Sequence, residues 1–205
     1  MIKKYITVIL ALGLFVSLYA QNVDGNIIEK RDGTAYIKDH NEPFTGEAYF
    51  FFENGKKKKV VPYYQGEIDG RLVEWYSNEQ IKTVAYFKAG KQDGEYIFKF
   101  SNGKKAMVAY FKEGKQDGEV KTWYDNGRKK SSAYFKDNLQ NGEAMTWYDN
   151  GKKASQGNYK NDKKIGKHVK WYDNGKKAYE AYFNDGVLVA KELVWDKDGQ
   201  LIAKN

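Results

Sequence analysis

The chain has 205 residues, a formal net charge of +8, 20 glycines and no cysteine, and 16% of its residues are aromatic. Because 30% of the residues are charged and the mean hydropathy is −0.80, the chain cannot fill a thick apolar core. Thin sheets that are exposed on at least one face fit this balance better. The absence of cysteine excludes disulfides and a lipid anchor on an N-terminal cysteine.

The first twenty residues differ from the rest of the chain. A short basic segment with Lys3 and Lys4 is followed by a nearly continuous apolar stretch over residues 5–19. This layout is typical of a secretory signal peptide, with Ala20-Gln21 as a plausible cleavage bond. The apolar stretch is short for a membrane span, although an uncleaved N-terminal anchor remains an alternative. We therefore expect residues 1–20 to be a signal peptide, and the mature part, residues 21–205, to be exported to the periplasm, the cell surface or the medium.

A repeat of 24 residues fills the mature part. A typical copy opens with a glycine and continues as in the segment GEAMTWYDNG at 142–151. The leading glycines recur at a constant spacing of 24 from Gly46 to Gly166, with a divergent copy before them and a partial copy after them. The predicted repeats begin near residues 27, 46, 70, 94, 118, 142, 166 and 190.

Each copy is predicted to form a strand, a tight turn, a second strand and a looser turn. The first run ends in an aromatic pair followed by Asp-Asn-Gly or a relative of it, as at 125–127. Asn-Gly between strand-like runs predicts a type I′ hairpin turn, which needs a positive φ at both central residues. The looser turn follows the second strand, as at 113–118. The sequence therefore predicts an all-β fold, an open, twisted and elongated single-layer antiparallel meander of roughly fourteen strands.

Aromatic residues recur at the sixth and eighteenth positions of the repeat, although Lys99 interrupts the sixth-position row. Since residues at one repeat position recur on one face of the sheet, we expect them to form ladders along its length. Cross-strand aromatic pairs contribute about 0.2–1 kcal/mol each. The predicted structural ladder comprises Trp75, Phe87, Phe111, Trp123, Phe135, Trp147, Trp171, Phe183 and Trp195.

The pattern Gly-Glu-x-x-x-Trp-Tyr-Asp-Asn-Gly, followed by Lys-Lys and then Tyr-Phe-Lys, resembles the variant form of the MORN repeat, a form also found in YwqK-like antitoxin components. The resemblance covers about residues 27–203. It implies a ribbon of β-hairpins that contacts other molecules, since MORN proteins are linked to membrane-lipid and protein contacts. A repeat architecture is a scaffold, so the resemblance says more about fold than about function.

No residue pattern points to catalysis, a metal or a cofactor. The two histidines, His40 and His168, lie far apart in the repeat order, and a zinc site needs more ligands than these. The turn at 125–127 lacks the further oxygen ligands of a calcium loop. No serine lies in a nucleophile-elbow pattern, and the acids beside the leading glycines fit turn chemistry. We therefore predict that the protein is not an enzyme and holds no metal or cofactor.

Basic residues recur just after the Asn-Gly turns and should line one rim of the ribbon, about 10 Å apart. A solvated edge, where lysines discourage edge-to-edge pairing of sheets, is the simplest explanation. A linear cationic track for an anionic lipid, glycan or protein surface is the functional alternative. The candidate binding residues are Lys56, Lys57, Lys58, Lys59, Lys104, Lys105, Arg128, Lys129, Lys152, Lys153, Lys176 and Lys177.

These features favour an exported, non-catalytic scaffold that mediates contact with a protein or with an anionic envelope or host-cell surface. An antitoxin or immunity protein that neutralises a toxin by binding is the alternative, although a signal peptide fits it poorly. Export also makes nucleic acid a less favoured partner, even though aromatic and basic residues alternate. The mature chain has no second apolar stretch of spanning length, so we expect no transmembrane span there, and the sequence leaves the oligomeric state open.

Overall fold

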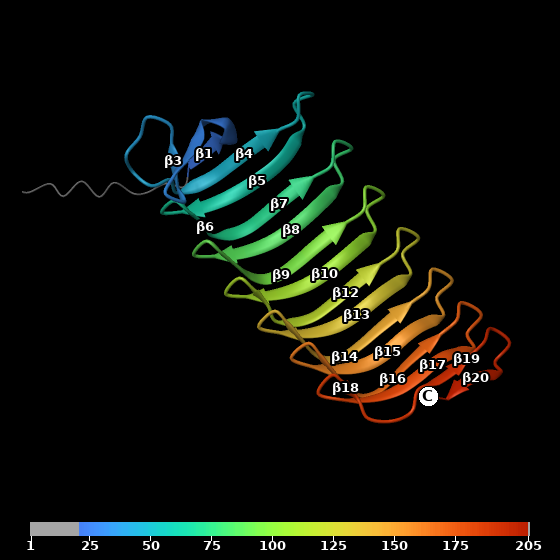
Figure 1. Ribbon diagram of the computed structural model, residues 1–205. Coiled ribbons are helices and arrows are strands. Elements are labelled where there is room, and N and C mark those ends of the chain that lie inside the picture. Colours follow the sequence, from blue (N-terminus) through green and yellow to red (C-terminus); the bar gives the residue numbers. More distant parts are fainter. Residues whose placement is uncertain (1–20, 205) are drawn as a thin grey trace, which may run out of the picture.

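The computed structural model describes residues 21–204, which are almost entirely β-structure (Figure 1). Hairpins follow one another in chain order along an elongated main sheet that is not closed. All pairings in this sheet are antiparallel except the one between its first two strands. The predicted fold class, an open and mostly antiparallel meander of hairpins, is therefore confirmed. The predicted signal peptide, residues 1–20, lies outside the described residues.

The repeats contribute two long strands each, and three two-residue strands continue the pairing beside the turns. The strands are β4 (Gly46–Phe51), β5 (Lys57–Tyr64), β6 (Glu67–Ile68), β7 (Gly70–Trp75), β8 (Ile81–Lys88), β9 (Lys91–Lys99), β10 (Lys105–Lys112), β11 (Lys115–Gln116), β12 (Gly118–Trp123), β13 (Lys129–Lys136), β14 (Leu139–Trp147), β15 (Lys153–Lys160), β16 (Lys163–Trp171), β17 (Lys177–Asn184), β18 (Val187–Leu188), β19 (Leu193–Trp195) and β20 (Leu201–Lys204). The period of 24 residues read from the sequence is thus the period of the hairpins.

The N-terminal segment closes one end of the array instead of adding a regular repeat to it. β1 (Gln21–Asp24) pairs in parallel with β4, and η1 (Gly25–Ile27), a turn of 3₁₀-helix, follows it. β2 (Ile28–Arg31) and β3 (Thr34–Ile37) form a separate two-stranded sheet. A buried apolar cluster joins this sheet to the first hairpin; its members are Ala35, Phe44, Ala48, Val61 and Tyr63.

The Asn-Gly turns are not the predicted type I′ turns. In the turn that begins at Tyr124, Gly127 has a φ of 92°, whereas Asn126 is not among the residues with positive φ. The Gly127 N–H donates to the Tyr124 carbonyl (2.9 Å), and the strand register shifts by one residue just before the turn. This is a type I turn followed by a glycine bulge, the usual geometry of a three-residue hairpin loop. The Asn126 side chain instead accepts a hydrogen bond from the Arg128 N–H (2.8 Å).

The type I′ geometry occurs at the opposite turns, which the sequence predicts to be looser. Glu113 and Gly114 have φ values of 50° and 82°, and the flanking residues Lys112 and Lys115 pair directly. The same two positive φ values recur at every copy of this turn in residues 21–204, even where the first central residue is Ala89. The two turns of each repeat have therefore exchanged the roles that the sequence predicted for them.

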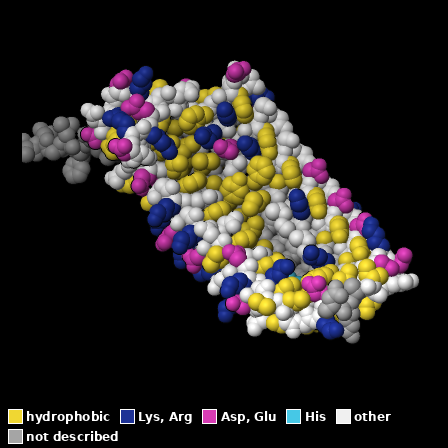
Figure 2. All heavy atoms as spheres, viewed as in Figure 1, with side chains coloured by type: hydrophobic (Ala, Val, Ile, Leu, Met, Phe, Trp, Pro, Cys, Tyr) yellow, Lys and Arg dark blue, Asp and Glu magenta, His cyan; other side chains and the backbone are white. Residues whose placement is uncertain are grey.

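Strand register divides every repeat into two faces. Across one hairpin, Val120 pairs with Ala133 and Thr122 with Ser131 on one face, while Lys121 pairs with Ser132 on the other. We call the first face the hollow face; it carries repeat positions 1, 3, 5, 14, 16 and 18, counted from the leading glycine. The outer face carries positions 2, 4, 6, 15 and 17. Figure 2 shows the hollow face, where apolar side chains gather over the N-terminal half of the array and become sparse over the C-terminal half.

In three of the repeats the leading glycine, Gly94, Gly118 or Gly142, lies directly against a tyrosine of the preceding strand. Gly142 has a φ of 126°, and a Cβ on it would lie 3.1 Å from the Cβ of Tyr134 on one side. On its other side it pairs with Tyr159, the aromatic residue of position 18. Glycine therefore provides both the positive φ and the room for the neighbouring rings, an arrangement in which aromatic residues shield a glycine in a strand.

Candidate functional site

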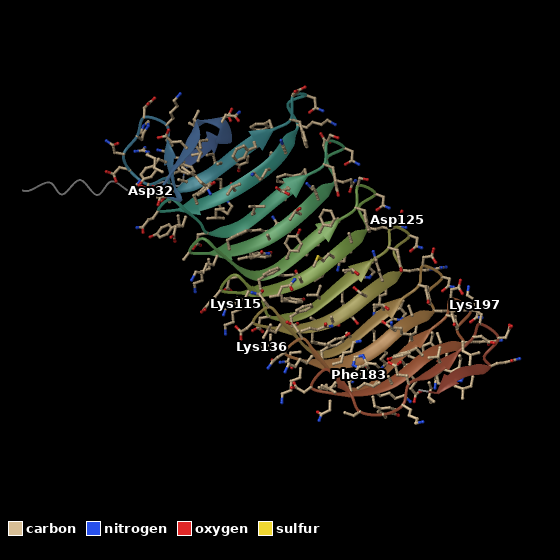
Figure 3. The ribbon with its side chains drawn as sticks, in the orientation of Figure 1. Asp32, Lys115, Asp125, Lys136, Phe183 and Lys197 are labelled. Atoms are coloured by element: carbon tan, nitrogen blue, oxygen red, sulfur yellow. The ribbon has the colours of Figure 1, made fainter. Side chains whose placement is uncertain are left out.

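The two rows of turns carry different charge. The Asn-Gly turn row contains 15 Lys and Arg residues and 7 Asp and Glu residues. We define this row as residues 52–59, 76–82, 100–105, 124–130, 148–153, 172–177 and 196–200. The opposite turn row contains 8 basic and 8 acidic residues. We define it as residues 64–69, 88–93, 112–117, 136–141, 160–165 and 184–189. Figure 3 shows Asp125 and Lys197 on the first edge of the ribbon, and Lys115 and Lys136 on the second. The net positive charge is therefore concentrated along one edge.

The opposite turn row neutralises its own charge with ion pairs between successive repeats. Lys115 contacts Asp137 (3.5 Å), and Lys136 contacts Asp117 (2.6 Å). Lys163 contacts Asp185 in the same way (2.8 Å). Exposed pairs of this kind add little stability each, but they leave the edge without a net field.

In the Asn-Gly turn row, the first cation after the turn reaches the next turn along the chain. The Nζ of Lys104 donates to the Asn126 carbonyl (3.0 Å), and the Nζ of Lys152 donates to the Asn174 carbonyl (2.8 Å). Arg128 and Lys176 make equivalent bonds to carbonyls at 2.8 Å. These four side chains are held along the edge, and each keeps N–H groups that the carbonyl does not use.

The second cation leans over an aromatic ring of the following repeat. Lys129 lies 5.6 Å from the ring centroid of Trp147, and Lys177 lies 5.0 Å from that of Trp195. Lys153 occupies the same place over Trp171 (5.9 Å). A cation within about 6 Å of an indole face gains roughly 0.5–1 kcal/mol where both are exposed. The basic edge therefore continues onto the outer face as alternating lysine and tryptophan.

The four lysines after the first Asn-Gly turn make different contacts and do not all lie on the same face. Lys56 pairs with Glu79 (3.4 Å), and Lys57 lies over the ring of Tyr49 on the outer face. Lys58 lies 5.8 Å from the ring of Phe52. Lys59 pairs with Phe50 in the strands and leans over its ring on the hollow face (4.7 Å). Lys59 is therefore the predicted binding residue that the register directs away from the edge.

The residues of the predicted aromatic ladder form two rows on opposite faces. The tryptophans of position 6 lie on the outer face beneath lysines, while the position 18 residues lie on the hollow face opposite the leading glycines. Ring-to-ring contacts involve few of them: Phe111 meets Tyr96 edge-on, and Phe183 meets His168. The repeat pattern alone does not indicate this separation, because one bulged residue in every hairpin reverses the alternation of faces.

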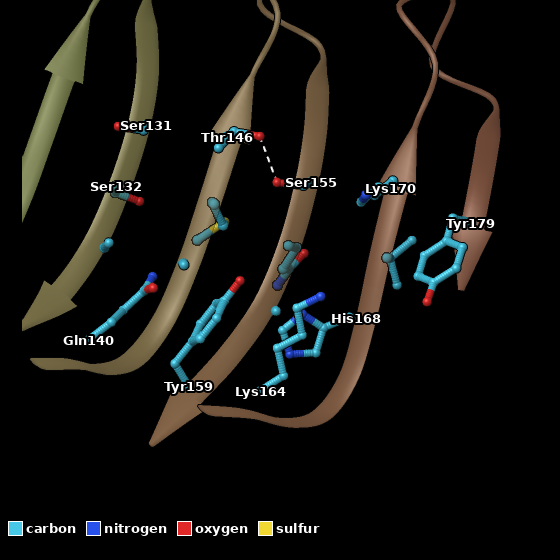
Figure 4. A pocket seen from close by; sticks show the side chains of 16 residues that line it. Ser131, Ser132, Gln140, Thr146, Ser155, Tyr159, Lys164, His168, Lys170 and Tyr179 are labelled. Atoms are coloured by element: carbon cyan, nitrogen blue, oxygen red, sulfur yellow. Dashed lines mark hydrogen bonds between the residues drawn. The ribbon is translucent and has the colours of Figure 1, made fainter. Parts of the chain in front are cut away.

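A depression of about 300 Å³ on the hollow face was not predicted from the sequence. It lies over β13–β17 and is lined by short polar side chains, among them Thr146 and Ser155, whose hydroxyl oxygens are 2.6 Å apart (Figure 4). Lys164, His168 and Lys170 lie at one end of it. The signal in the sequence is the recurrence of threonine at position 5 and serine at position 14 in the copies that begin at Gly118 and Gly142.

Two titratable groups sit at the centre of the sheet in the C-terminal half. Lys167 and Lys177 contact the two oxygens of Glu180 at 2.8 and 2.7 Å, and these hydrogen bonds lower the pKa of its carboxyl group. On the hollow face, the ring of His168 lies edge-on between Tyr159 and Phe183, and its burial lowers the pKa of the imidazole. Both groups therefore hold one charge state in the folded protein near neutral pH.

Residues 21–204 contain no group of three His, Cys, Asp or Glu side chains placed to hold a metal ion. In the same part of the chain, no helix is long and apolar enough to cross a membrane. The recurring features of the described residues are the basic edge, the lysine-tryptophan face and the polar depression. All three lie on the surface of a repeat scaffold.

Four segments of the chain match the family model of the MORN repeat variant: residues 44–64, 116–137, 140–161 and 164–185. Each segment is one hairpin centred on an Asn-Gly turn, and these four hairpins are MORN-variant repeats. MORN repeats are generally modules that bind proteins or membranes. No match was found among curated proteins. The finer likeness to YwqK-like antitoxin components stays a prediction.

The copies that begin at Gly70 and Gly94 fall outside these matches, and both depart from the consensus. Glu79 replaces the turn glycine of the first and takes a φ of 69°, while Lys99 replaces the tryptophan of the second. The turn at Glu79 nevertheless makes the same backbone bonds, from the Glu79 N–H to the Tyr76 carbonyl and from the Tyr76 N–H to the Gln80 carbonyl (2.9 Å each). The hairpin therefore persists where the motif has diverged.

Proposed function

We propose that this protein is an exported, non-catalytic scaffold that binds an anionic partner, a membrane or an acidic protein surface, through its Asn-Gly turn row. The observation that carries the proposal is the difference in charge between the two edges, because a solvated edge needs no net charge and the opposite turn row has none. Cations that are held in line at repeat spacing attract an anionic surface along the whole ribbon. The general binding role of MORN repeats agrees with this function.

The lysine-tryptophan alternation on the adjoining outer face favours a membrane over a soluble acidic protein. Tryptophan is enriched where apolar and polar phases meet, and basic residues near an anionic membrane contribute about 1 kcal/mol each. Lys129, Lys153 and Lys177 lie directly above tryptophan rings at the edge of the ribbon. Headgroup phosphates would meet the lysines, and the rings would lie at the level of the headgroups.

The test is cosedimentation with phosphatidylcholine vesicles, with and without a fraction of phosphatidylserine, at low and high salt. A variant in which Lys57, Lys105 and Lys153 are changed to Gln removes three charges from the Asn-Gly turn row. The matched control changes three exposed lysines of the opposite row that lie at the ends of second strands: Lys88, Lys112 and Lys160.

We expect binding only to the anionic vesicles, weakened at least about tenfold in the first variant and changed little in the control. Equal losses in both variants would reduce the effect to net charge, and unchanged binding in the first variant would refute the track. Salt-insensitive capture of a protein whose toxicity the chain suppresses would favour the antitoxin alternative instead. Export is tested separately, by whether the protein from the periplasm or medium begins at Gln21 by mass spectrometry.

A further inference from the structure

The hollow face changes its chemistry at positions 5 and 14 between the copy that begins at Gly94 and the two copies that follow it. Positions 5 and 14 face each other across each hairpin; in the copy that begins at Gly94 they are Phe98 and Met107. In the next copy they are Thr122 and Ser131, with hydroxyl oxygens 2.6 Å apart. The following copy repeats the pair at the same distance, in Thr146 and Ser155. Two successive rungs therefore present hydroxyl pairs where the preceding rung presents apolar side chains.

These hydroxyl pairs retain hydrogen-bonding capacity toward the solvent side. Each hydroxyl group has one donor and two acceptor sites, so a bonded pair such as Thr146 and Ser155 uses one of its two donors and leaves the other free. All four hydroxyl residues are partly exposed. Gln140 adds an amide group to the lining, and Figure 4 shows it on the same side of the sheet as the Thr146–Ser155 pair.

The charge of the depression is complementary to an anion. Its lining contains Lys164, Lys170 and His168 but no Asp or Glu, although the chain has 27 acidic residues. Lys164 lies over the ring of Phe183 (4.8 Å), and Lys170 lies over the ring of Tyr179 (5.5 Å). Lys170 is exposed and Lys164 is partly exposed, and neither forms an ion pair with a carboxylate of residues 21–204.

The occupant of this surface must be recognised through side chains. Each of the strands β13–β17 is paired with a neighbouring strand on both sides, so their backbone groups cannot add the strand of a peptide. What remains are hydroxyl and amide groups, two cations and the rings of Tyr159 and Tyr179. A ligand with many hydroxyl groups, ring C–H bonds that can pack against aromatic faces, and a negative charge matches all of these.

We propose that the depression over β13–β17 binds an acidic oligosaccharide, with Thr146, Ser155 and Gln140 hydrogen-bonding its hydroxyl groups and Lys164 and Lys170 contacting its carboxylate. This site lies on the hollow face, so it does not depend on the Asn-Gly turn row of the proposed function. A ribbon with both surfaces can hold an anionic surface along its edge and a sugar chain across its face.

The experiment is isothermal titration of the purified protein with tetragalacturonate and with the neutral galactose tetramer. One variant, Thr146→Val with Ser155→Ala, keeps side-chain volume while removing the hydroxyl groups. A second, Lys164→Gln with Lys170→Gln, removes the two positive charges. The matched control, Lys152→Gln with Lys176→Gln, removes two charges from the Asn-Gly turn row. Thermal unfolding confirms that each variant is folded.

We expect the acidic tetramer to bind at least about tenfold more tightly than the neutral one, because bonds to charged groups are the stronger ones. The lysine variant should abolish this preference, the hydroxyl variant should weaken both sugars, and the turn-row control should change neither. Failure of the acidic tetramer to bind, equal affinity for both sugars, or binding that survives the lysine variant would overturn the proposal. Tighter binding of a glutamate peptide with the same lysine dependence would also overturn it. None of these results bears on binding of vesicles at the turn row.

Discussion

The repeats that begin at residues 46, 70 and 94 share strand register and turn bonding with those that begin at 118, 142 and 166, yet their centres differ. On the outer face, position 15 is valine in all three N-terminal copies, as at Val84, whereas the C-terminal copies carry Ser132, Gln156 and Glu180. The hollow face changes in the same direction. Because pairing is unaffected, the turns and leading glycines specify the ribbon, and the middle of each strand is free to carry other chemistry.

The largest expected loss of stability comes from placing the buried glutamate of the C-terminal half at the same repeat position in the N-terminal half. Val84 is 6% exposed and pairs with Val73 and Ile97, and Ile81 stands at the repeat position of Lys177. Val84→Glu would bury a carboxylate with at most one cation nearby, so we expect a loss of about 3 kcal/mol in the free energy of unfolding. Urea denaturation measures it. Val84→Thr is the milder control, and equal losses for both would contradict the electrostatic explanation.

A pH dependence should arise in the C-terminal half alone. Because burial lowers the pKa of His168 below 6.5, the unfolded chain binds more protons than the folded one once the pH falls below about 6.5. Stability should therefore fall with pH from that point down to the lowered pKa of the folded state. Thermal unfolding between pH 8 and 5 tests this, and His168→Phe should flatten the curve in this range. A wild-type midpoint that is constant over this range would refute the prediction.

A substitution in one turn of the N-terminal half should increase the stability of the protein. Ala89 holds a φ of 46° at a type I′ turn, a conformation that asparagine tolerates better than alanine. The equivalent position in the C-terminal half already has Asp137. We expect Ala89→Asn to stabilise the protein by about 0.5–1 kcal/mol in urea denaturation. Lys88→Asn, one residue earlier, lacks a positive φ and should bring no gain.

The smallest effect is expected from the reverse exchange, Glu180→Val. Replacing a buried ion pair by a well-packed apolar side chain is often close to neutral, and Lys167 and Lys177 can extend into solvent. We expect a change within about 1 kcal/mol by the same denaturation assay. A loss as large as that of Val84→Glu would show that the two halves depend on their centres in different ways.

The sequence predicted the hairpin period, the open meander and the row of basic residues, because a constant spacing of Asn-Gly turns and leading glycines leaves little freedom in how the chain pairs. It assigned the type I′ geometry to the wrong turn. Asn-Gly is compatible with two hairpin geometries, and Glu113-Gly114 or Ala89-Gly90 give little local indication of a positive φ at their first residue.

The polar depression and the division of the aromatic residues were not predicted because both depend on the bulge beside the Asn-Gly turn. Without the bulge, the alternation of side chains along the strands would place positions 6 and 18 on the same face. With the bulge, Trp171 and Phe183 lie on opposite faces. Likewise, Thr146 and Ser155 are nine residues apart and meet only because the register shifts by one.

The bonds that join successive Asn-Gly turns have a consequence for how the chain acquires its structure. The hydroxyl of Tyr124 donates to the carbonyl of Trp147, 23 residues on, and the same bond recurs from Tyr148 to Trp171 and from Tyr172 to Trp195. Each bond therefore links neighbouring repeats only, and the loop it closes costs little entropy. A chain emerging from a ribosome can complete its N-terminal cap first and then add each hairpin as soon as it is free, so folding can keep pace with synthesis.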